Sequence, residues 1–386
     1  MLGKLTGPTT GHSQFAQLFS DEALIEAGLR FELALADACA AAGLLSSAEL
    51  QAIVSAAERV DLSIDSFAEE VHHAGTLAIP LVAALKSEAR AIEPSAAEKV
   101  HLGSTSQDLA DTVNALISQS AAKQIVQNGK VLGDELAILS KRHQSTLMVG
   151  RTITRRALPI TFGLKVANWL VELVGALESL HRVASGLALQ LAGPTGTMIN
   201  LGGRGAQIQE HMARVLALSE PSFPWHTNRQ QVARLSVELN LLCSALGKIA
   251  QDVALLGQDE IGELAETHPA GRGGSSAMAH KQNPTSSQQA LLAIGKVKSL
   301  SASILSAPIQ EYERSIQGWQ AELGIVAEQF IWSADALALV TGMIQRLQVN
   351  QKRMNENLAD AGVGTDTGES ERLVDAAISL FERSDL

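Results

Sequence analysis

Apolar residues recur at spacings of three and four residues through the middle of the chain. The longest such seam runs from Val232 to Leu256 and covers more than three heptads. Two further seams lie within 170–187 and 290–304. This period predicts helices with one apolar face each, and the sequence contains no alternating strand pattern and no Asn-Gly hairpin turn. The longest seam consists of Val232, Leu235, Leu239, Leu242, Leu246, Ile249, Val253 and Leu256.

The distribution of proline allows these helices to be long. No proline occurs in 95–158, 225–268 or 309–386, and proline is the residue that breaks a helix most strongly. We therefore expect an all-α fold built on a long central helix bundle. The expected parts are an N-terminal helical domain (1–100), a central long-helix bundle domain (101–349) and a short C-terminal helical segment (350–386).

Each seam residue, taken singly, is explained most simply as a core residue. The length of the seams nevertheless points beyond one subunit. A helix of roughly 35 residues spans about 50 Å, which is longer than one small domain needs. We therefore infer that the chain forms oligomers through the bundle.

Composition then limits the class of protein. The chain has 386 residues, enough for two or three domains, and its 46% hydrophobic and 18% charged residues are typical of a globular protein. The formal net charge of −11 disfavours a nucleic-acid partner that needs a basic surface. Aromatic residues make up only 3%, which disfavours base-stacking platforms as well.

The two cysteines and the apolar runs bear on the cellular compartment. Cys39 and Cys243 stand in no metal-ligand spacing and imply no disulfide framework. The first 20 residues lack the apolar core of a signal peptide, and no uncharged apolar run reaches the roughly 18 residues that span a bilayer. We expect a cytoplasmic protein without membrane contact.

Three polar segments interrupt the helical pattern, and the first is 101–108, His-Leu-Gly-Ser-Thr-Ser-Gln-Asp. Hydroxyl groups and free backbone N–H groups at a helix start can bind a carboxylate or a phosphate. His101, Thr105 and Ser106 are therefore candidate binding residues. The same segment also fits a plain helix N-cap.

The second segment is 150–156, in which Arg151, Arg155 and Arg156 lie close together beside Thr152. An arginine guanidinium matches a carboxylate with two parallel hydrogen bonds. A solvated helix start is the alternative interpretation of this segment.

The third segment, 268–284, is rich in glycine and contains Ser275, Lys281 and Asn283. A glycine-rich loop can close over a substrate and exclude water, and a serine beside a lysine can act as base or nucleophile. A flexible surface loop is the alternative. Two single candidates, His226 in Pro-Trp-His-Thr and Arg314 in Glu-Tyr-Glu-Arg, also allow a purely structural role.

Taken together, these segments resemble the fumarase/aspartase superfamily. Residues 274–284 read Gly-Ser-Ser-x-Met-x-x-Lys-x-Asn-Pro and are similar to the signature loop of that superfamily. Its members also carry a Thr-Ser segment followed by a Gly-Arg-Thr segment, and both stand here in the same order, at 104–108 and 150–152. The resemblance covers the chain from about Leu24 to Val349. Details similar to the bacterial 3-carboxy-cis,cis-muconate cycloisomerases lie at 75–82, 105–108, 158–163, 224–227, 278–281, and 313–314 with 319–322.

The resemblance implies a homotetramer whose active sites each draw motifs from three subunits, with no metal and no organic cofactor. It also implies an intramolecular reaction on a small polycarboxylate. One carboxylate of 3-carboxy-cis,cis-muconate would add across a double bond and give 4-carboxymuconolactone, in the protocatechuate branch of the β-ketoadipate pathway.

Such a site must hold three carboxylates, stabilise an enediolate-like intermediate and deliver a proton to carbon. On the resemblance, Lys281 and Asn283 would stabilise the charge that develops on the reacting carboxylate. Ser275 matches the base of the superfamily's eliminations and would deliver the proton in the lactonising direction. The substrate would be bound by His101, Thr105, Ser106, Arg151, Thr152, Arg155, Arg156, His226 and Arg314.

The sequence departs from the superfamily at several positions. Ile153 stands where many relatives have a histidine that assists proton transfer, and Arg155 stands where glutamine is usual. Ala279 replaces the usual proline of the loop, and His226 or His280 is left to supply a proton. Only some 37 residues follow position 349, so we expect a reduced C-terminal domain.

Two alternatives remain open at this point. One is adenylosuccinate lyase or a related lyase, for which a histidine in place of Ile153 would be the discriminating feature. The other is a non-catalytic helical-bundle protein, which Ile153 and Ala279 favour and the combination of Ser275, Lys281 and Asn283 opposes.

Overall fold

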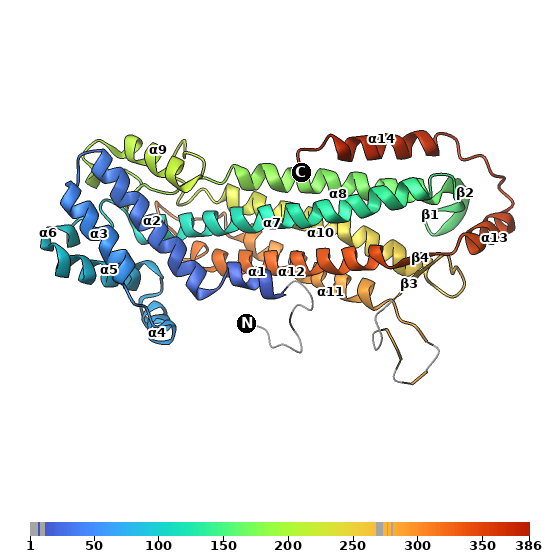
Figure 1. The fold of residues 1–386 in the computed structure, drawn as a ribbon, viewed down its shortest axis with the longest axis horizontal. Helices are drawn as coiled ribbons and strands as arrows, with labels where there is room; N and C mark the ends of the chain where they lie inside the picture. The colour runs from blue at the N-terminus through green and yellow to red at the C-terminus, as the bar shows by residue number, and fades with distance from the viewer. Residues whose placement is uncertain (1–6, 8–11, 268–272, 276, 279–280) are drawn as a thin grey trace.

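The computed structural model describes residues 7, 12–267, 273–275, 277–278 and 281–386. It is an elongated bundle of helices, with most of the short helices gathered at one end and two small two-stranded sheets at the other (Figure 1). Five long helices run along the bundle, and their packing confirms the expected all-α class. These helices are α7 (Ser106–Arg142), α8 (Phe162–Ser185), α10 (Gln230–Leu256), α11 (Thr285–Ser306) and α12 (Trp319–Gln345).

The remaining elements lie at the ends and along the side of this bundle. The N-terminal part of the chain packs at the end where α7 begins, and α14 lies along α8 (Figure 1). The shorter helices are α1 (His12–Leu18), α2 (Asp21–Ala41), α3 (Ser47–Arg59), α4 (Ile64–Ala74), α5 (Ala78–Ile92), α6 (Pro94–Ala97), the 3-10 helix η1 (Ile199–Leu201), α9 (Gly205–Leu216), α13 (Gln351–Ala361) and α14 (Ser370–Glu382).

The apolar seams form the core of the bundle. All eight positions of the seam in α10 are buried, as are Leu170, Leu173, Leu177 and Leu180 of α8. Close approach of α8 to α7 depends on Gly129, where an added Cβ would lie 2.4 Å from Leu177. The helical period of the sequence therefore identified the buried faces correctly. The three-part division of the chain stays a prediction.

Helices α10 and α12 are long and apolar enough, by length and composition alone, to cross a membrane. In α10, 50% of the apolar window is buried inside the protein, and in α12 the share is 61%. Both helices pack against α11 and against each other. Such burial is typical of core helices, so we assign their apolar character to the bundle interior.

The two small sheets are a departure from the sequence-based expectation, which contained no strands. Strands β1 (Leu147–Thr152) and β2 (Arg155–Thr161) pair antiparallel, as do β3 (Leu264–Glu266) and β4 (Leu347–Val349). The first hairpin turns at Ile153 and Thr154, whose φ angles are 49° and 63°. Such a turn usually carries Asn or Gly, because both central residues have positive φ. Ile-Thr gives no such signal, so the interpretation of this segment as a helix start was wrong.

A buried arginine joins three of the long helices. Arg229, just before α10, donates two hydrogen bonds of 2.8 Å to Asp111 of α7. Its Nε also donates to Glu322 of α12 at 3.1 Å, and its guanidinium carbon lies 4.9 Å from the centre of the Trp225 ring. Burial alone lowers the pKa of Arg229, but the two carboxylates outweigh it and raise that pKa. The cation therefore fixes the start of α12 against α7.

We expect Arg229→Met to destabilise the fold strongly. Asp111 and Glu322 stay buried after the change but lose their cation, and breaking such a pair costs about 3–5 kcal/mol of unfolding free energy. Urea unfolding at one fixed protein concentration measures the loss. Arg90→Ala, which breaks the exposed Arg90–Glu98 pair, is the matched control and should cost less than about 1 kcal/mol. Equal losses in the two variants would contradict the assignment.

Candidate active site

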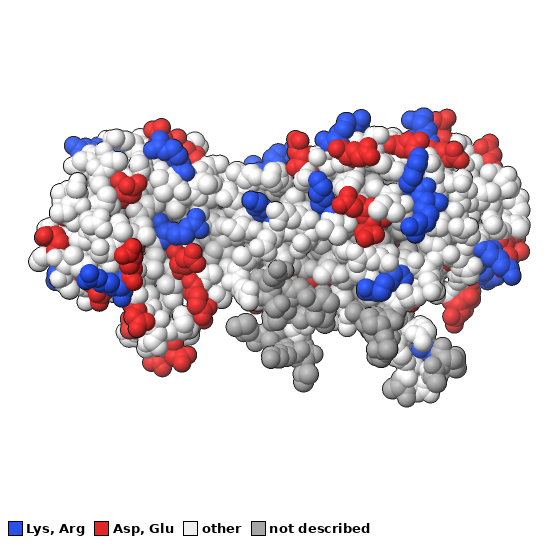
Figure 2. Space-filling view, in the orientation of Figure 1, with Lys and Arg blue, Asp and Glu red and all other residues white. Residues whose placement is uncertain are grey.

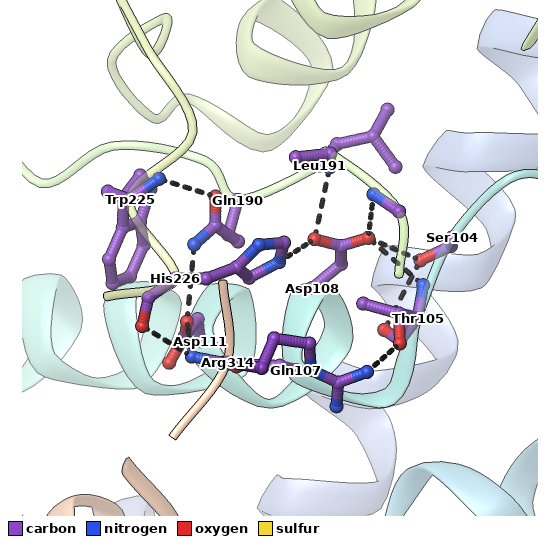
Figure 3. Close-up of polar contacts among 12 residues, drawn as sticks. Ser104, Thr105, Gln107, Asp108, Asp111, Gln190, Leu191, Trp225, His226 and Arg314 are labelled. Atoms are coloured by element: carbon purple, nitrogen blue, oxygen red, sulfur yellow. Dashed lines mark hydrogen bonds and ion pairs between the residues drawn. The ribbon is translucent and has the colours of Figure 1, made fainter. Parts of the chain in front are cut away.

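The start of α7 is organised around one buried carboxylate, that of Asp108 (Figure 3). It accepts hydrogen bonds from the backbone N–H groups of Thr105, Ala192 and Gly193, at 3.0, 3.0 and 2.9 Å. The Nε2 of His226 donates a further bond of 2.7 Å to the same carboxylate. These bonds satisfy the charge of Asp108 and tie three distant segments of the chain together.

His226 is held inside the protein by this arrangement. Its side chain is buried, and its backbone oxygen accepts a hydrogen bond of 2.8 Å from Gln107. Trp225 beside it is buried as well and donates its indole N–H to the carbonyl of Leu189 at 2.9 Å. The Pro-Trp-His-Thr segment therefore braces the end of the bundle, and in this chain the contacts of His226 are structural.

Arg314 reaches the same helix start from the connection between α11 and α12. Its Nη1 donates to the side-chain oxygen of Thr105 at 2.6 Å (Figure 3). Thr105 caps α7 through a capping box with Asp108, and Ser106 is the first residue of the helix. The structure thus brings together a guanidinium, two hydroxyl groups and the free N–H groups of a long helix. This combination suits a carboxylate ligand.

His101 belongs to the same end of the molecule. It stands just before the turn into α7, with a φ of 64° that is uncommon for a residue other than glycine. Its Nδ1 lies 2.6 Å from Oε1 of Glu32 in α2, and the Glu32 side chain is only 1% exposed. Burial lowers the pKa of His101, but the attraction and hydrogen bond of Glu32, helped by Asp108, raise it overall.

The second group of candidates lies on the β1–β2 hairpin, beyond the far end of α7. Arg155, Arg156 and Thr152 are exposed, whereas Arg151 is partly buried. Both terminal nitrogens of Arg151 donate to the fully buried carboxylate of Glu263, at 2.8 and 2.7 Å. Arg151 therefore fastens the hairpin to the segment before β3, while its two neighbours remain available to a ligand.

The third group lies on the loop between β3 and α11. The hydroxyl oxygen of Ser275 accepts from the backbone N–H of Met278 at 3.1 Å, and Asn283 donates its backbone N–H to Gly273 at 2.8 Å. A cavity of about 540 Å³, a size typical of ligand pockets, is bordered by Lys281 and Asn283 together with Glu266. Two residues named above, Ala279 and His280, lie outside the described residues.

Glu266, at the end of β3, joins the two ends of this loop. Its carboxylate accepts the backbone N–H groups of Ser286 and Ser287, at 2.9 and 3.0 Å, and also the hydroxyl of Ser287. It thereby caps the N-terminus of α11 from across the loop, where a negative charge is stabilised by the helix dipole. The ends of the loop that carries Ser275 are fixed by this contact.

These groups cannot meet within one chain. Helix α7 has 37 residues and separates Thr105 from the β1–β2 hairpin by about 55 Å. Helix α11 has 22 residues and separates the loop of Ser275 from Arg314 by about 33 Å. The structure therefore divides the sequence-predicted residues between opposite ends of the bundle.

Sequence reasoning missed the buried acids that hold the candidates in place. Glu32, Asp111, Glu263 and Glu322 are all buried, and each binds a cationic side chain named above. A single acidic residue within an apolar helical stripe can indicate a buried acid. It does not indicate which cationic side chain that acid binds. Among the described residues, no group of three or more His, Cys, Asp or Glu side chains is arranged to hold a metal ion.

Comparison with known proteins agrees with this geometry. A family model described as "Lyase" matches residues 7–298. The chain is 36% identical to a 3-carboxy-cis,cis-muconate cycloisomerase of Bradyrhizobium diazoefficiens, over 92% of this chain and 79% of the relative. It is also 36% identical to the enzyme of the same name from Pseudomonas aeruginosa, over 88% of this chain and 74% of the relative.

The fold has a solved counterpart as well. The crystal structure of 3-carboxy-cis,cis-muconate lactonizing enzyme from Pseudomonas putida superposes with a TM-score of 0.87 at 29% sequence identity. The match covers 96% of this chain and 97% of the other. Family model, relatives and fold agree, and the chain therefore belongs to the lyase family of the fumarase/aspartase superfamily.

Proposed function

We propose that this chain is a 3-carboxy-cis,cis-muconate cycloisomerase. The observation that carries the proposal is the 36% identity, over 92% of the chain, to a relative with that activity in its name. The hairpin supports the same choice. Its tip carries Ile153, a side chain that can neither donate nor accept a proton, in the place of the histidine typical of many lyases.

The groups at the two ends of the bundle divide the work of this reaction. Arg314 at the start of α7, with Arg155 and Arg156 on the hairpin, holds the substrate carboxylates. Thr105 and Ser106 add hydroxyl groups for the carboxylate oxygens. The braced side chains of Arg151 and His226 keep these surfaces in place through Glu263 and Asp108.

The loop supplies the chemistry at the reacting carbon. Lys281 and Asn283 border the cavity of the loop and stabilise the negative charge that moves onto the substrate during addition. The hydroxyl of Ser275 hands a proton to the carbon that has received the electron pair. Thr152 on the hairpin contributes a further hydroxyl to the substrate. No redox step occurs, because one C–O bond and one C–H bond form while one C=C π bond and the O–H bond of the proton donor break.

We also propose that a complete site forms only between subunits. The hairpin tip exposes Ile153 and carries Arg155 and Arg156, so it is apolar and basic. The connection between α11 and α12, which carries Arg314, is apolar and acidic. Its exposed side chains include Ile309, Glu311, Tyr312, Glu313 and Ile316. The exposed fractions of the apolar side chains are 95% for Ile153, 90% for Ile309, 90% for Tyr312 and 86% for Ile316.

These two complementary surfaces lie at opposite ends of each chain, so a second copy must bring them together. The long helices also expose large apolar side chains, and the middle of the visible face carries fewer charges than its ends (Figure 2). A homotetramer with sites shared among three subunits accounts for both features. The exposed apolar residues on α7, α8, α10 and α11 are Val131, Ile138, Val171, Leu241, Leu255, Leu292 and Leu305.

The proposed localisation follows from the proposed substrate. A small polycarboxylate of aromatic degradation is a cytoplasmic metabolite class, and we propose a cytoplasmic enzyme. The net charge of −11 is consistent with a site whose cations are local rather than general.

Turnover of 3-carboxy-cis,cis-muconate tests the proposed function directly. We expect the purified protein to remove the diene absorbance of this compound and to yield 4-carboxymuconolactone. Adenylosuccinate, tested in parallel, should not react. Turnover of adenylosuccinate without turnover of the muconate would overturn the proposal, and inactivity on both would favour a non-catalytic bundle protein.

Replacement of Ser275 by alanine tests the role of the loop. We expect Ser275→Ala to lower kcat by about 10²-fold or more, because positioned proton transfer contributes about that factor. The substitution removes one partly exposed hydroxyl outside the helices and should leave the helical circular dichroism unchanged. Ser299→Ala, on the exposed face of α11, is the control and should keep full activity. Near wild-type turnover of Ser275→Ala would remove Ser275 from the mechanism.

Subunit mixing tests the shared site. Arg314→Ala and Ser275→Ala, each nearly inactive alone, are coexpressed with different tags and the doubly tagged oligomers are purified. If each site takes Arg314 and Ser275 from different subunits, random assembly restores about a quarter of the wild-type activity. Mixed oligomers as inactive as their parents would show that both residues must come from one chain, against the proposal.

A further inference from the structure

The proposed reaction needs an acid, for which the sequence left His226 or His280 as candidates. A serine hydroxyl is a poor acid at neutral pH, so Ser275 can hand its proton to carbon only if another group replaces that proton at once. Ile153 cannot do so. His226 is buried, with its Nε2 bound to Asp108 at 2.7 Å. His280 lies outside the described residues, so we consider the other described residues near the start of α7 as sources of an accessible acidic proton.

His101 has the geometry of such an acid. Its Nδ1 is bound to Glu32 at 2.6 Å, and its ring remains 15% exposed. Within the described residues, no hydrogen-bond partner engages its Nε2. One ring nitrogen is therefore anchored in the protein while the ring stays partly exposed, four residues before Thr105, to which Arg314 is bound.

Glu32 is placed to keep this ring protonated. One of its oxygens binds His101, and the other, Oε2, is buried without a hydrogen-bond partner within the described residues. A buried carboxylate with so few partners is stabilised mainly by a cation beside it. The charged groups that act on His101 are Glu32 of α2, Asp108 of α7 and Lys86 of α5, and the two acids outweigh the lysine.

The backbone adds a second constraint. His101 has a φ of 64°, and the turn that follows includes Gly103, which packs closely against Leu201 and whose carbonyl oxygen lies beside Gly193. A residue other than glycine is held in this region only when its surroundings enforce it, and such residues gather at functional sites. The ion pair with Glu32 is the enforcing contact that the structure shows.

We propose that His101 is the proton source of the cycloisomerisation and that Glu32 is the positioning residue that keeps it charged. This inference rests on the proposed function and on the shared site. The substrate carboxylate oxygen forms a C–O bond, and the π electron pair moves to the neighbouring carbon. That carbon takes the proton of the Ser275 hydroxyl, and Ser275 takes the Nε2 proton of His101. The neutral imidazole then regains a proton from water.

The test measures kcat and KM against pH for wild type, His101→Asn and Glu32→Gln, with 3-carboxy-cis,cis-muconate as substrate. Asparagine tolerates positive φ, and glutamine keeps a hydrogen-bond acceptor for Nδ1, so both variants preserve the local structure. Helical circular dichroism and oligomer size confirm folding. Asp37→Asn is the matched control, because it removes the carboxylate from the His211–Asp37 pair, which is 2.6 Å long and away from the site.

We expect His101→Asn to lower kcat by about 10²-fold with KM changed less than about threefold. The acid form of His101 exists below its pKa, so wild-type kcat falls as the pH rises through that raised pKa. Glu32→Gln removes the negative charge that raises the pKa of His101. The fall of kcat at high pH should therefore move to lower pH by about one unit. Asp37→Asn should leave the pH of this fall unchanged.

The outcomes separate this inference from the proposed function. A wild-type enzyme without turnover would refute the function, and the pKa of His101 would then still be read from NMR titration of ring-labelled histidine in wild type and Glu32→Gln. An unchanged pKa in Glu32→Gln would refute the role of Glu32. If wild type turns over and His101→Asn raises KM while keeping kcat, His101 only binds a carboxylate, and the proposal is overturned.

Discussion

The first two turns of α7 carry two buried carboxylates, Asp108 and Asp111, and the organisation of one end of the molecule depends on them. A buried charge is tolerated only when hydrogen bonds or a cation replace the lost water. Asp108 is satisfied by three backbone N–H groups and His226, and Asp111 by the two terminal nitrogens of Arg229. Because both carboxylates need these partners, the segments around 192, 226 and 229 pack against the start of α7.

The same logic recurs at the positions that carry the candidate chemistry. Glu32 anchors His101, Glu263 anchors Arg151, and Glu266 caps α11 beside the loop of Ser275. His101, Arg151 and the loop of Ser275 are thus each held in place by a buried or partly buried acid. Preorganisation of this kind lowers the cost of orienting charges when the substrate binds. It also gives a globally acidic protein a locally cationic site.

The length of the bundle sets the second constraint. A helix of 37 residues keeps the residues at its two ends about 55 Å apart, and the proposed shared site brings such residues together through packing between chains. The apolar and basic hairpin tip and the apolar and acidic connection beside Arg314 are then two halves of one proposed interface. On this view, the exposure of Ile153, Ile309 and Tyr312 is a property of the isolated chain.

The sequence by itself determined the helical class, the buried faces and the family. Seam positions such as Leu239 and Leu246 follow a period of 3.6 residues, which is a local property of the chain, and the signature loop is a contiguous motif. The β1–β2 hairpin could not be predicted, because Ile153 and Thr154 adopt positive φ without the residues that favour it.

Only the tertiary structure decided which candidate side chains are braced and which are exposed. Arg151 and Arg155 look equivalent in the sequence, yet Arg151 is bound to Glu263, 112 positions away, while Arg155 is exposed. His101 and His226 differ in the same way, since one pairs with Glu32 and keeps an exposed edge and the other is enclosed beside Asp108. Long-range ion pairs of this kind depend on how distant helices pack, and no local pattern of residues encodes them.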